Sequence, residues 1–268
     1  MRRALRLSAV LAGLAAGAAV AGEQLPSRDD ACRFSEQERA RAAAAASAGT
    51  LLLADGRLLR LAGIEAPHQR EPGASAARAT LQALVQGRTL TIRTPGSHTD
   101  RYGRLVAYVE EDSTAGGGPT IQERLLRLGH ARVAGRVESA ACAAALLSAE
   151  RAARDAGAGL WKLPYYALRR AENPDEVLAE RGRFTLVAGR VLSVRESGGT
   201  VYVNFGRRFA EDFTVTVRRR DARTFAAAGR PLPELAGRQV LVRGIVERRG
   251  GPWIEALRPE QIEVVARD

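Results

Sequence analysis

The chain has little lysine, few cysteines and few aromatic residues. Lys162 is the only lysine among 41 basic residues, and phenylalanine, tryptophan and tyrosine make up 5% of the 268 residues. Aliphatic residues are nevertheless plentiful enough for two modest hydrophobic cores. Beyond residue 21 no segment is apolar enough to cross a membrane, so the remainder is expected to have no transmembrane segment.

The first 21 residues have the pattern of a cleaved signal peptide. Arg2, Arg3 and Arg6 precede an apolar run from Leu7 to Val20, and Ala19-Val20-Ala21 is a small-x-small cleavage signal. The run is short and rich in alanine for a membrane anchor. We therefore expect export, either to the periplasm or to the medium.

The two cysteines, Cys32 and Cys142, remain after such cleavage. An even number of cysteines in an oxidising compartment favours a disulfide, which would pin the N-terminal arm to a helix of the first domain. Two unpaired thiols are the alternative. No second cysteine or paired histidine lies nearby to favour a metal-binding or catalytic role.

The net charge of +11 is unevenly distributed along the chain. Residues 22–180 carry 21 basic and 20 acidic side chains, whereas residues 181–268 carry 17 basic and 10 acidic side chains. The excess in the C-terminal third predicts a polyanion-binding module. A solvated basic surface, with the strong preference for arginine reflecting the genome's base composition, is the competing interpretation.

Hydrophobic patterning predicts an N-terminal arm over residues 22–46 and a first domain over 47–163. The arm is polar and then rich in alanine, and its end, residues 39–48, leans helical. An Asp55-Gly56 pair between apolar alternations predicts a hairpin. The expected strands lie at 50–54, 57–64, 89–94 and 104–110, with helices at 75–86, 120–128 and 139–156.

Residues 164–180 are polar and are expected to form a linker to a second domain over 181–268. Strands are predicted at 185–194, 200–206, 213–218, 238–248 and 253–257, with a short helix at 221–229. Three strands, a helix and two strands are the order of an OB-fold barrel. A generic β-barrel is the alternative.

Three ordered motifs of the first domain resemble the staphylococcal nuclease (thermonuclease) family. Members typically read D-G-D-T, then R-L-x-G-I-D-x-P-E, then T-D-x-Y-G-R. This chain reads A-G-T at 48–50, R-L-A-G-I-E-A-P-H at 60–68 and T-D-R-Y-G-R at 99–104, and a helix of E-x-x-A-R type then closes on Gly-Leu-Trp at 159–161. The resemblance, over residues 50–161, implies a mainly β fold with helices (α+β): an OB barrel with flanking helices, followed here by a second, small OB-like barrel.

The resemblance also implies a phosphodiester-cleaving site that uses calcium. Arg60 and Arg104 match the family's two phosphate-binding arginines. Glu65 stands where the family has a calcium-binding aspartate, Gly49 replaces the other one, and His68 replaces the catalytic glutamate. This sequence therefore keeps few of the ligands that the family uses to bind calcium. His68 is a candidate general base, and Glu65 with His68 is a candidate pair for zinc or manganese.

Two functions remain open from the sequence, and whether the chain is an enzyme remains open with them. One is an exported, metal-dependent nuclease with a degenerate metal site. The other is a non-catalytic protein of tandem OB-like barrels that binds nucleic acid or another anion. Nucleic acid, DNA or RNA, is the expected partner in both. Four aromatic residues of the second domain are expected either to stack on bases or to lie in the core: Tyr202, Phe205, Phe213 and Trp253.

Overall fold

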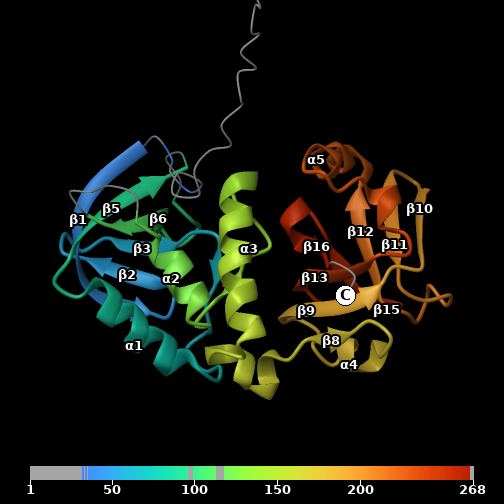
Figure 1. Cartoon of the computed structure of the whole chain (residues 1–268), viewed down its shortest axis with the longest axis horizontal. Coiled ribbons are helices and arrows are strands. Elements are labelled where there is room, and N and C mark those ends of the chain that lie inside the picture. The colour runs from blue at the N-terminus through green and yellow to red at the C-terminus, as the bar shows by residue number, and fades with distance from the viewer. Residues whose placement is uncertain (1–31, 33, 35, 96–98, 113–117, 266–268) are drawn as a thin grey trace, which may run out of the picture.

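The computed structural model describes residues 32, 34, 36–95, 99–112 and 118–265. The expected signal peptide, residues 1–21, lies outside them. The described chain has a mixed α+β fold, with a closed five-stranded barrel and a second module built from two further sheets. Helix α3 (Ala140–Asp155) stands between the barrel and the second module (Figure 1). None of the described helices is long and apolar enough to cross a membrane.

The barrel closes in the strand order β1-β2-β3-β6-β5. Its strands are β1 (Glu36–Ser47), β2 (Thr50–Leu53), β3 (Leu58–Leu61), β5 (Thr89–Thr94) and β6 (Leu105–Glu111). The predicted hairpin at Asp55-Gly56 is confirmed: Gly56 has a φ of 88°, and Leu53 N donates to Arg57 O at 2.9 Å. Only β3 and β6 run parallel among the barrel pairs.

Strand β1 corrects the expectation that residues 39–48 lean helical and belong to a separate arm. Its first half pairs with β5 and its second half pairs with β2, so β1 closes the barrel. This pairing on both sides overrides the helix propensity of alanine. The register shifts near Ala42 and Ala45 mark where the strand bends from one partner to the other.

Helices cover the outside of the barrel and confirm the predicted positions. Helix α1 (Ala74–Val85) buries Ala77, Leu81 and Val85. Helix α2 (Ile121–Arg127) begins with a capping box in which Thr120 and Glu123 bond reciprocally. Two short strands, β4 (Ile64–Glu65) and β7 (Arg132–Val133), pair beside the barrel. The predicted disulfide between Cys32 and Cys142 is present and ties the N-terminal segment to α3.

The segment expected as a linker packs onto the second module. Strand β8 (Arg169–Arg170) pairs in parallel with β9 (Phe184–Arg190). Tyr166 and Val177 are buried, the latter in helix α4 (Pro174–Leu178). The segment is therefore part of a packed structure rather than a free connection.

The second module contains two sheets, of order β10-β11-β12-β15-β14 and β16-β13-β9-β8. The remaining elements are β10 (Ser193–Ser197), β11 (Thr200–Asn204), β12 (Thr214–Arg218), α5 (Ala222–Ala227), β13 (Gln239–Ile245), β14 (Glu247–Arg249), β15 (Gly251–Glu255) and β16 (Ile262–Val264), with 3-10 turns at Gly159–Lys162, Pro164–Tyr166, Arg219–Asp221, Leu232–Leu235 and Pro259–Gln261. The two long strands predicted at 185–194 and 238–248 are each split in two. The predicted turn at Gly198-Gly199 is confirmed, with both glycines at positive φ.

The strands of the second module pair in the same cyclic order as those of the barrel. For this comparison β9 and β10 count together as the first strand, β11 as the second, β12 as the third, β13 and β14 together as the fourth, and β15 as the fifth. The first strand then pairs with the second, the second with the third, the third with the fifth, the fifth with the fourth, and the fourth with the first. The third and fifth strands are parallel in both modules. Because the strands form two sheets, a single closed OB-like barrel stays a prediction.

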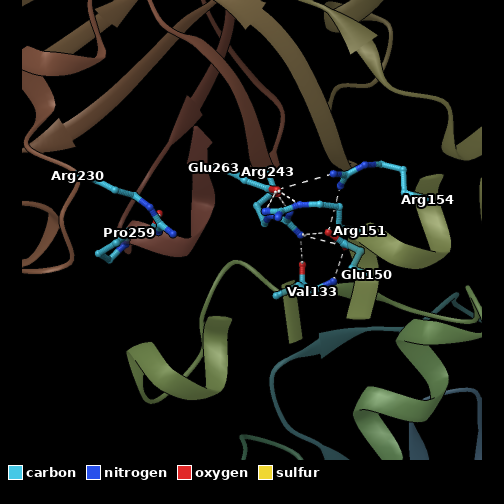
Figure 2. A network of polar contacts seen from close by, with 8 residues as sticks. All are labelled: Val133, Glu150, Arg151, Arg154, Arg230, Arg243, Pro259 and Glu263. Atoms are coloured by element: carbon cyan, nitrogen blue, oxygen red, sulfur yellow. Dashed lines mark hydrogen bonds and ion pairs between the residues drawn. The ribbon is translucent and has the colours of Figure 1, made fainter. Parts of the chain in front are cut away.

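Buried charges join the two modules at α3 (Figure 2). Arg243 of β13 is fully buried; it donates to Glu150 of α3 at 2.9 Å and to Glu263 of β16 at 3.2 Å. Glu150 also accepts from Val133 N at 2.7 Å. Arg151 reaches Glu263 from the solvent side at 2.6 Å. No local pattern in the sequence indicates this network.

We predict that Arg243→Ala or Glu150→Ala lowers the free energy of unfolding by about 3–5 kcal/mol, because each removes the fully buried ion pair between Arg243 and Glu150 and leaves the other charge of that pair in place. Arg151→Ala is the matched control: it removes an arginine of the same network whose side chain is 52% exposed. We expect it to cost about 0–1 kcal/mol. Urea unfolding of the three variants measures the difference, and an Arg243→Ala cost as small as the control would contradict the prediction.

Reduction of the disulfide is predicted to lower the free energy of unfolding by about 3–5 kcal/mol, because the bridge closes a long loop in the unfolded chain. The two cysteines are 110 residues apart. Urea unfolding with and without dithiothreitol measures the effect. A Cys32→Ser/Cys142→Ser variant should match the reduced chain and no longer respond to dithiothreitol.

Candidate functional site

A pocket of about 760 Å³ opens on the barrel where four segments meet. These are the turn from β1 to β2, strand β3, the loop after β4 and the loop before β6. All five residues that the motifs placed in a site line this pocket: Gly49, Arg60, Glu65, His68 and Arg104. Thr50, Asp100 and Tyr102 line it as well. Segments far apart in the chain thus meet as expected.

Strand alternation positions Arg60. Its neighbours Leu59 and Leu61 lie in the barrel core, so the side chain between them faces outward. Arg60 pairs with Thr50 on β2 and with Val106 on β6, which places it at the centre of three adjacent strands.

Arg104 is held by Asp100. One carboxylate oxygen accepts from the backbone N of Tyr102 at 2.9 Å and of Arg104 at 3.1 Å. The other accepts from Arg104 Nε at 2.8 Å and lies 2.7 Å from Nη2. Gly103, with a φ of 73°, closes this tight turn. Asp100 therefore fixes the loop that presents Arg104.

These contacts set the protonation of Asp100. Burial alone would raise its pKa, but the hydrogen bonds from the Arg104 side chain and from the two backbone amides outweigh burial, and the pKa is lowered. The carboxylate therefore stays charged at neutral pH. Arg104 Nη1 is left facing Thr50 Oγ1 at 3.5 Å.

Glu65 lies between Arg60 and His68. One of its oxygens is 4.0 Å from Arg60 Nη2, and the other is 3.8 Å from His68 Nε2. The pairing of Glu65 with Arg132 across β4 and β7 fixes its backbone. His68 is largely exposed, and its backbone N donates to Glu71 at 2.9 Å. The carboxylate is therefore loosely paired with both neighbours.

The residues of the pocket do not fit a calcium site. Calcium takes six to eight oxygen ligands. Both oxygens of Asp100 are engaged by Arg104 and Tyr102, which leaves Glu65 as the one other carboxylate lining the pocket. In the part of the chain that the structure describes, no group of three or more His, Cys, Asp or Glu side chains is arranged to hold a metal ion. Glu65 and His68 supply two ligands to any other divalent metal.

The turn at Gly49 explains why its missing carboxylate is not easily restored. Gly49 O accepts from Leu61 N at 2.9 Å, so the turn is tied to the end of β3. A Cβ at residue 49 would lie 3.1 Å from the Cβ of Ala66. An aspartate here would thus require the loop carrying Ala66 to shift by a few tenths of an ångström.

A second groove, of about 470 Å³, shares Arg60 and Glu65 with the pocket. It runs between the barrel and the second module, where Phe184, Ile245 and Leu257 line its far side. No motif in the sequence indicates this groove, because it depends on how the two modules pack.

We predict that Asp100→Asn lowers the free energy of unfolding by about 1.5–3 kcal/mol, because it removes a charge-assisted bond to Arg104. Asp55→Asn is the control, since Asp55 bonds to Arg57 in an exposed turn; it should lower the free energy of unfolding less than Asp100→Asn does, because solvent screens an exposed ion pair. The pKa of Asp100 is lower folded than unfolded, so its contribution is complete at neutral pH and lost as pH falls below about 4. Urea unfolding at neutral and acid pH should therefore show the two curves of wild type and Asp100→Asn converging in acid.

No curated protein matches the chain significantly. A family model described as Staphylococcal nuclease homologue matches residues 58–163. The match spans β3 to β6 and helices α1 to α3, and it includes the two arginines, Glu65 and His68 of the pocket. Together with the closed five-stranded barrel, it shows that this chain carries a domain of the staphylococcal nuclease family.

Proposed function

We propose that the pocket binds a phosphodiester of a nucleic acid between Arg60 and Arg104. One observation carries this proposal: both arginines line a single pocket, and Arg60 pairs with Thr50, whose hydroxyl accepts from Arg104. The planar guanidinium group can meet two phosphate oxygens at once. The family of the domain supports nucleic acid as the source of that phosphate.

The two arginines differ in how many contacts their guanidinium groups already make within the protein. Arg104 commits Nε and Nη2 to Asp100, so its orientation is fixed; Nη1 has one long bond, to Thr50 Oγ1 at 3.5 Å, and keeps a second hydrogen for a ligand. Arg60 has Glu65 only at 4.0 Å, a distance at the limit of an ion pair. A phosphate oxygen would therefore displace little when it meets Arg60, and it would find Arg104 already oriented.

Hydrolysis of the bound phosphodiester is the second candidate function, and the Glu65–His68 pair favours it. In this reaction His68 Nε2 takes a proton from water, whose oxygen attacks phosphorus while the ester P–O bond breaks. The departing oxygen takes a proton from solvent. Arg60 and Arg104 stabilise the charge that develops on the phosphate oxygens. The reaction is proposed without calcium, because the donor set of the pocket does not fit that ion.

We further propose that the chain is exported. The basic and then apolar pattern of residues 1–21 supports this, as does the disulfide between Cys32 and Cys142, which suits an oxidising compartment. Mass spectrometry of the full chain expressed in a Gram-negative bacterium should find an N-terminus near residue 22 in the periplasm or medium. An intact N-terminus in the cytoplasm would contradict export.

Binding is tested by fluorescence anisotropy with a labelled single-stranded oligonucleotide. Because charge-assisted bonds to phosphate are lost, Arg60→Ala and Arg104→Ala should each weaken binding by about 10-fold or more. Arg57→Ala is the matched control: it removes an arginine of the same hairpin that bonds to Asp55 and Glu38 rather than lining the pocket. Equal affinities for all three variants would contradict the proposal.

Turnover is tested on the same oligonucleotide with EDTA, calcium, manganese or zinc. Cleavage that disappears in Arg104→Ala and His68→Ala would support hydrolysis, whereas binding without cleavage under every condition would exclude it. A designed gain of function uses Gly49→Asp with His68→Glu, and adds Ala66→Gly to relieve the 3.1 Å contact at residue 49. Calcium-dependent cleavage by this variant would show that the lost carboxylates are what limits the natural site.

A further inference from the structure

The outer face of the sheet β10-β11-β12-β15-β14 carries arginine and aromatic side chains. Valines at alternate positions point into the core of the second module: Val201, Val203, Val215 and Val217. The residues between them therefore face outward. Arg195 lies opposite Tyr202, and Tyr202 lies opposite Thr216, across three strands of this face. Trp253 lies opposite Thr214 and is buried, yet it is not part of the module's core cluster.

Arginines and aromatic rings are in contact on this face. The guanidinium carbon of Arg195 lies 5.3 Å from the ring centre of Phe209, and that of Arg249 lies 3.4 Å from the ring of Trp253. Tyr202 is 37% exposed and Phe209 is 47% exposed. Of the four aromatic residues considered from the sequence, Phe213 is buried in the core, so Tyr202 is the one most open to a ligand.

Several arginines of this face have no ion-pair partner among the described residues, while two carboxylates share the face: Glu255 pairs with Arg218, and Glu247 lies opposite Trp253. In the described chain no carboxylate forms an ion pair with Arg195, Arg207, Arg248 or Arg249, whereas Arg208 pairs with Glu211. The loop carrying Arg207 and Phe209 packs against the turn between β14 and β15, since a Cβ at Gly250 would meet Ala210 O at 2.7 Å. Arginines without an ion pair, from two strands and one loop, therefore lie around the exposed rings. We call Arg195, Tyr202, Phe209 and Arg249 the arginine–aromatic face.

We propose that the arginine–aromatic face is a second binding site, for single-stranded nucleic acid, separate from the barrel pocket. Bases would stack on Tyr202 and Phe209, while the arginines hold the adjoining phosphates. A polyanion without bases would need the charges alone, so the two exposed rings among unpaired arginines favour a nucleic acid. This inference does not depend on phosphate binding in the barrel pocket.

The face is not a copy of that pocket, although the two modules share their strand pairing. Thr200 pairs with Arg218, and Arg219 N donates to Gly199 O, as Thr50 pairs with Arg60 and Leu61 N donates to Gly49 O. Arg218 thus stands in the place of Arg60. It donates to Glu255 at 2.8 Å, and this ion pair neutralises the position. Nucleic acid would therefore bind to this module through other residues, with its bases stacked on Tyr202 and Phe209.

The test uses residues 22–268 with Arg60→Ala and Arg104→Ala, so that the pocket is silenced, and compares labelled oligothymidine with an abasic strand of equal length. We expect Tyr202→Ala with Phe209→Ala to weaken oligothymidine binding about tenfold or more and to leave abasic binding unchanged. Tyr202→Phe should retain binding, because stacking needs only the ring. Arg195→Ala with Arg249→Ala should weaken binding of both strands and reduce the salt dependence.

Arg223→Ala is the matched control, since it removes an exposed arginine from α5 rather than from this face. Urea unfolding confirms that each variant is folded. Equal affinity for oligothymidine and the abasic strand, unaffected by loss of the rings, would overturn the proposal and assign a general polyanion surface. Binding to phosphatidylserine vesicles that is lost with the rings, without binding to oligothymidine, would overturn it in favour of a membrane surface. If instead the pocket substitutions leave wild-type binding unchanged, the pocket proposal fails and this one stands.

Discussion

The buried contact of Arg243 with Glu150 and Glu263 determines how the two modules sit against each other. Three charges that would each be costly alone are compatible with burial here because each finds an opposite charge or a backbone group. The same interface is sealed by Val137 N donating to Glu260 at 2.7 Å and by Arg132 donating to Phe184 O at 2.8 Å. With α3 held in this way, the groove that shares Arg60 and Glu65 with the pocket gains its second wall.

The pocket has well-supported positive groups but few negative ones. The positively charged half is well supported, because Asp100 contacts Arg104 three times and the backbone N of Tyr102 once, and the strand pairing fixes Arg60. The anionic half consists of Glu65 alone, since Asp100 is committed to the loop and residue 49 has no side chain. A site that is positive on balance is suited to gripping an anion, and it is poorly suited to holding a divalent cation. The close approach of Gly49 to Ala66 indicates that the small residues at these two positions are matched to each other.

The shared strand order of the two modules shows how one topology can present different chemistry. Equivalent positions carry Arg60 in the barrel and Arg218 in the second module, but a neighbouring Glu255 turns the latter into an ion pair. The outward positions of the second module carry Arg195, Tyr202 and Arg249 instead. Arg195 and Arg249 lie within cation–π distance of the rings of Phe209 and Trp253, so this face differs from the pocket in the kind of ligand group it suits.

Local patterns in the sequence determined most of the elements and the members of the pocket. The Asp55-Gly56 turn, the helices ending at Gly87 and Gly157, and the three motifs that bring Arg60, Glu65, His68 and Arg104 together could be read directly, because turn chemistry and short motifs act over a few residues. Tertiary structure alone decided that the alanine-rich segment 36–47 is a strand, since two barrel neighbours supply the hydrogen bonds that a helix would otherwise have made internally. It also decided that residues 164–180 pack onto the second module and that Arg243 meets Glu150. These contacts join residues up to 93 positions apart, and no local pattern encodes such a distance.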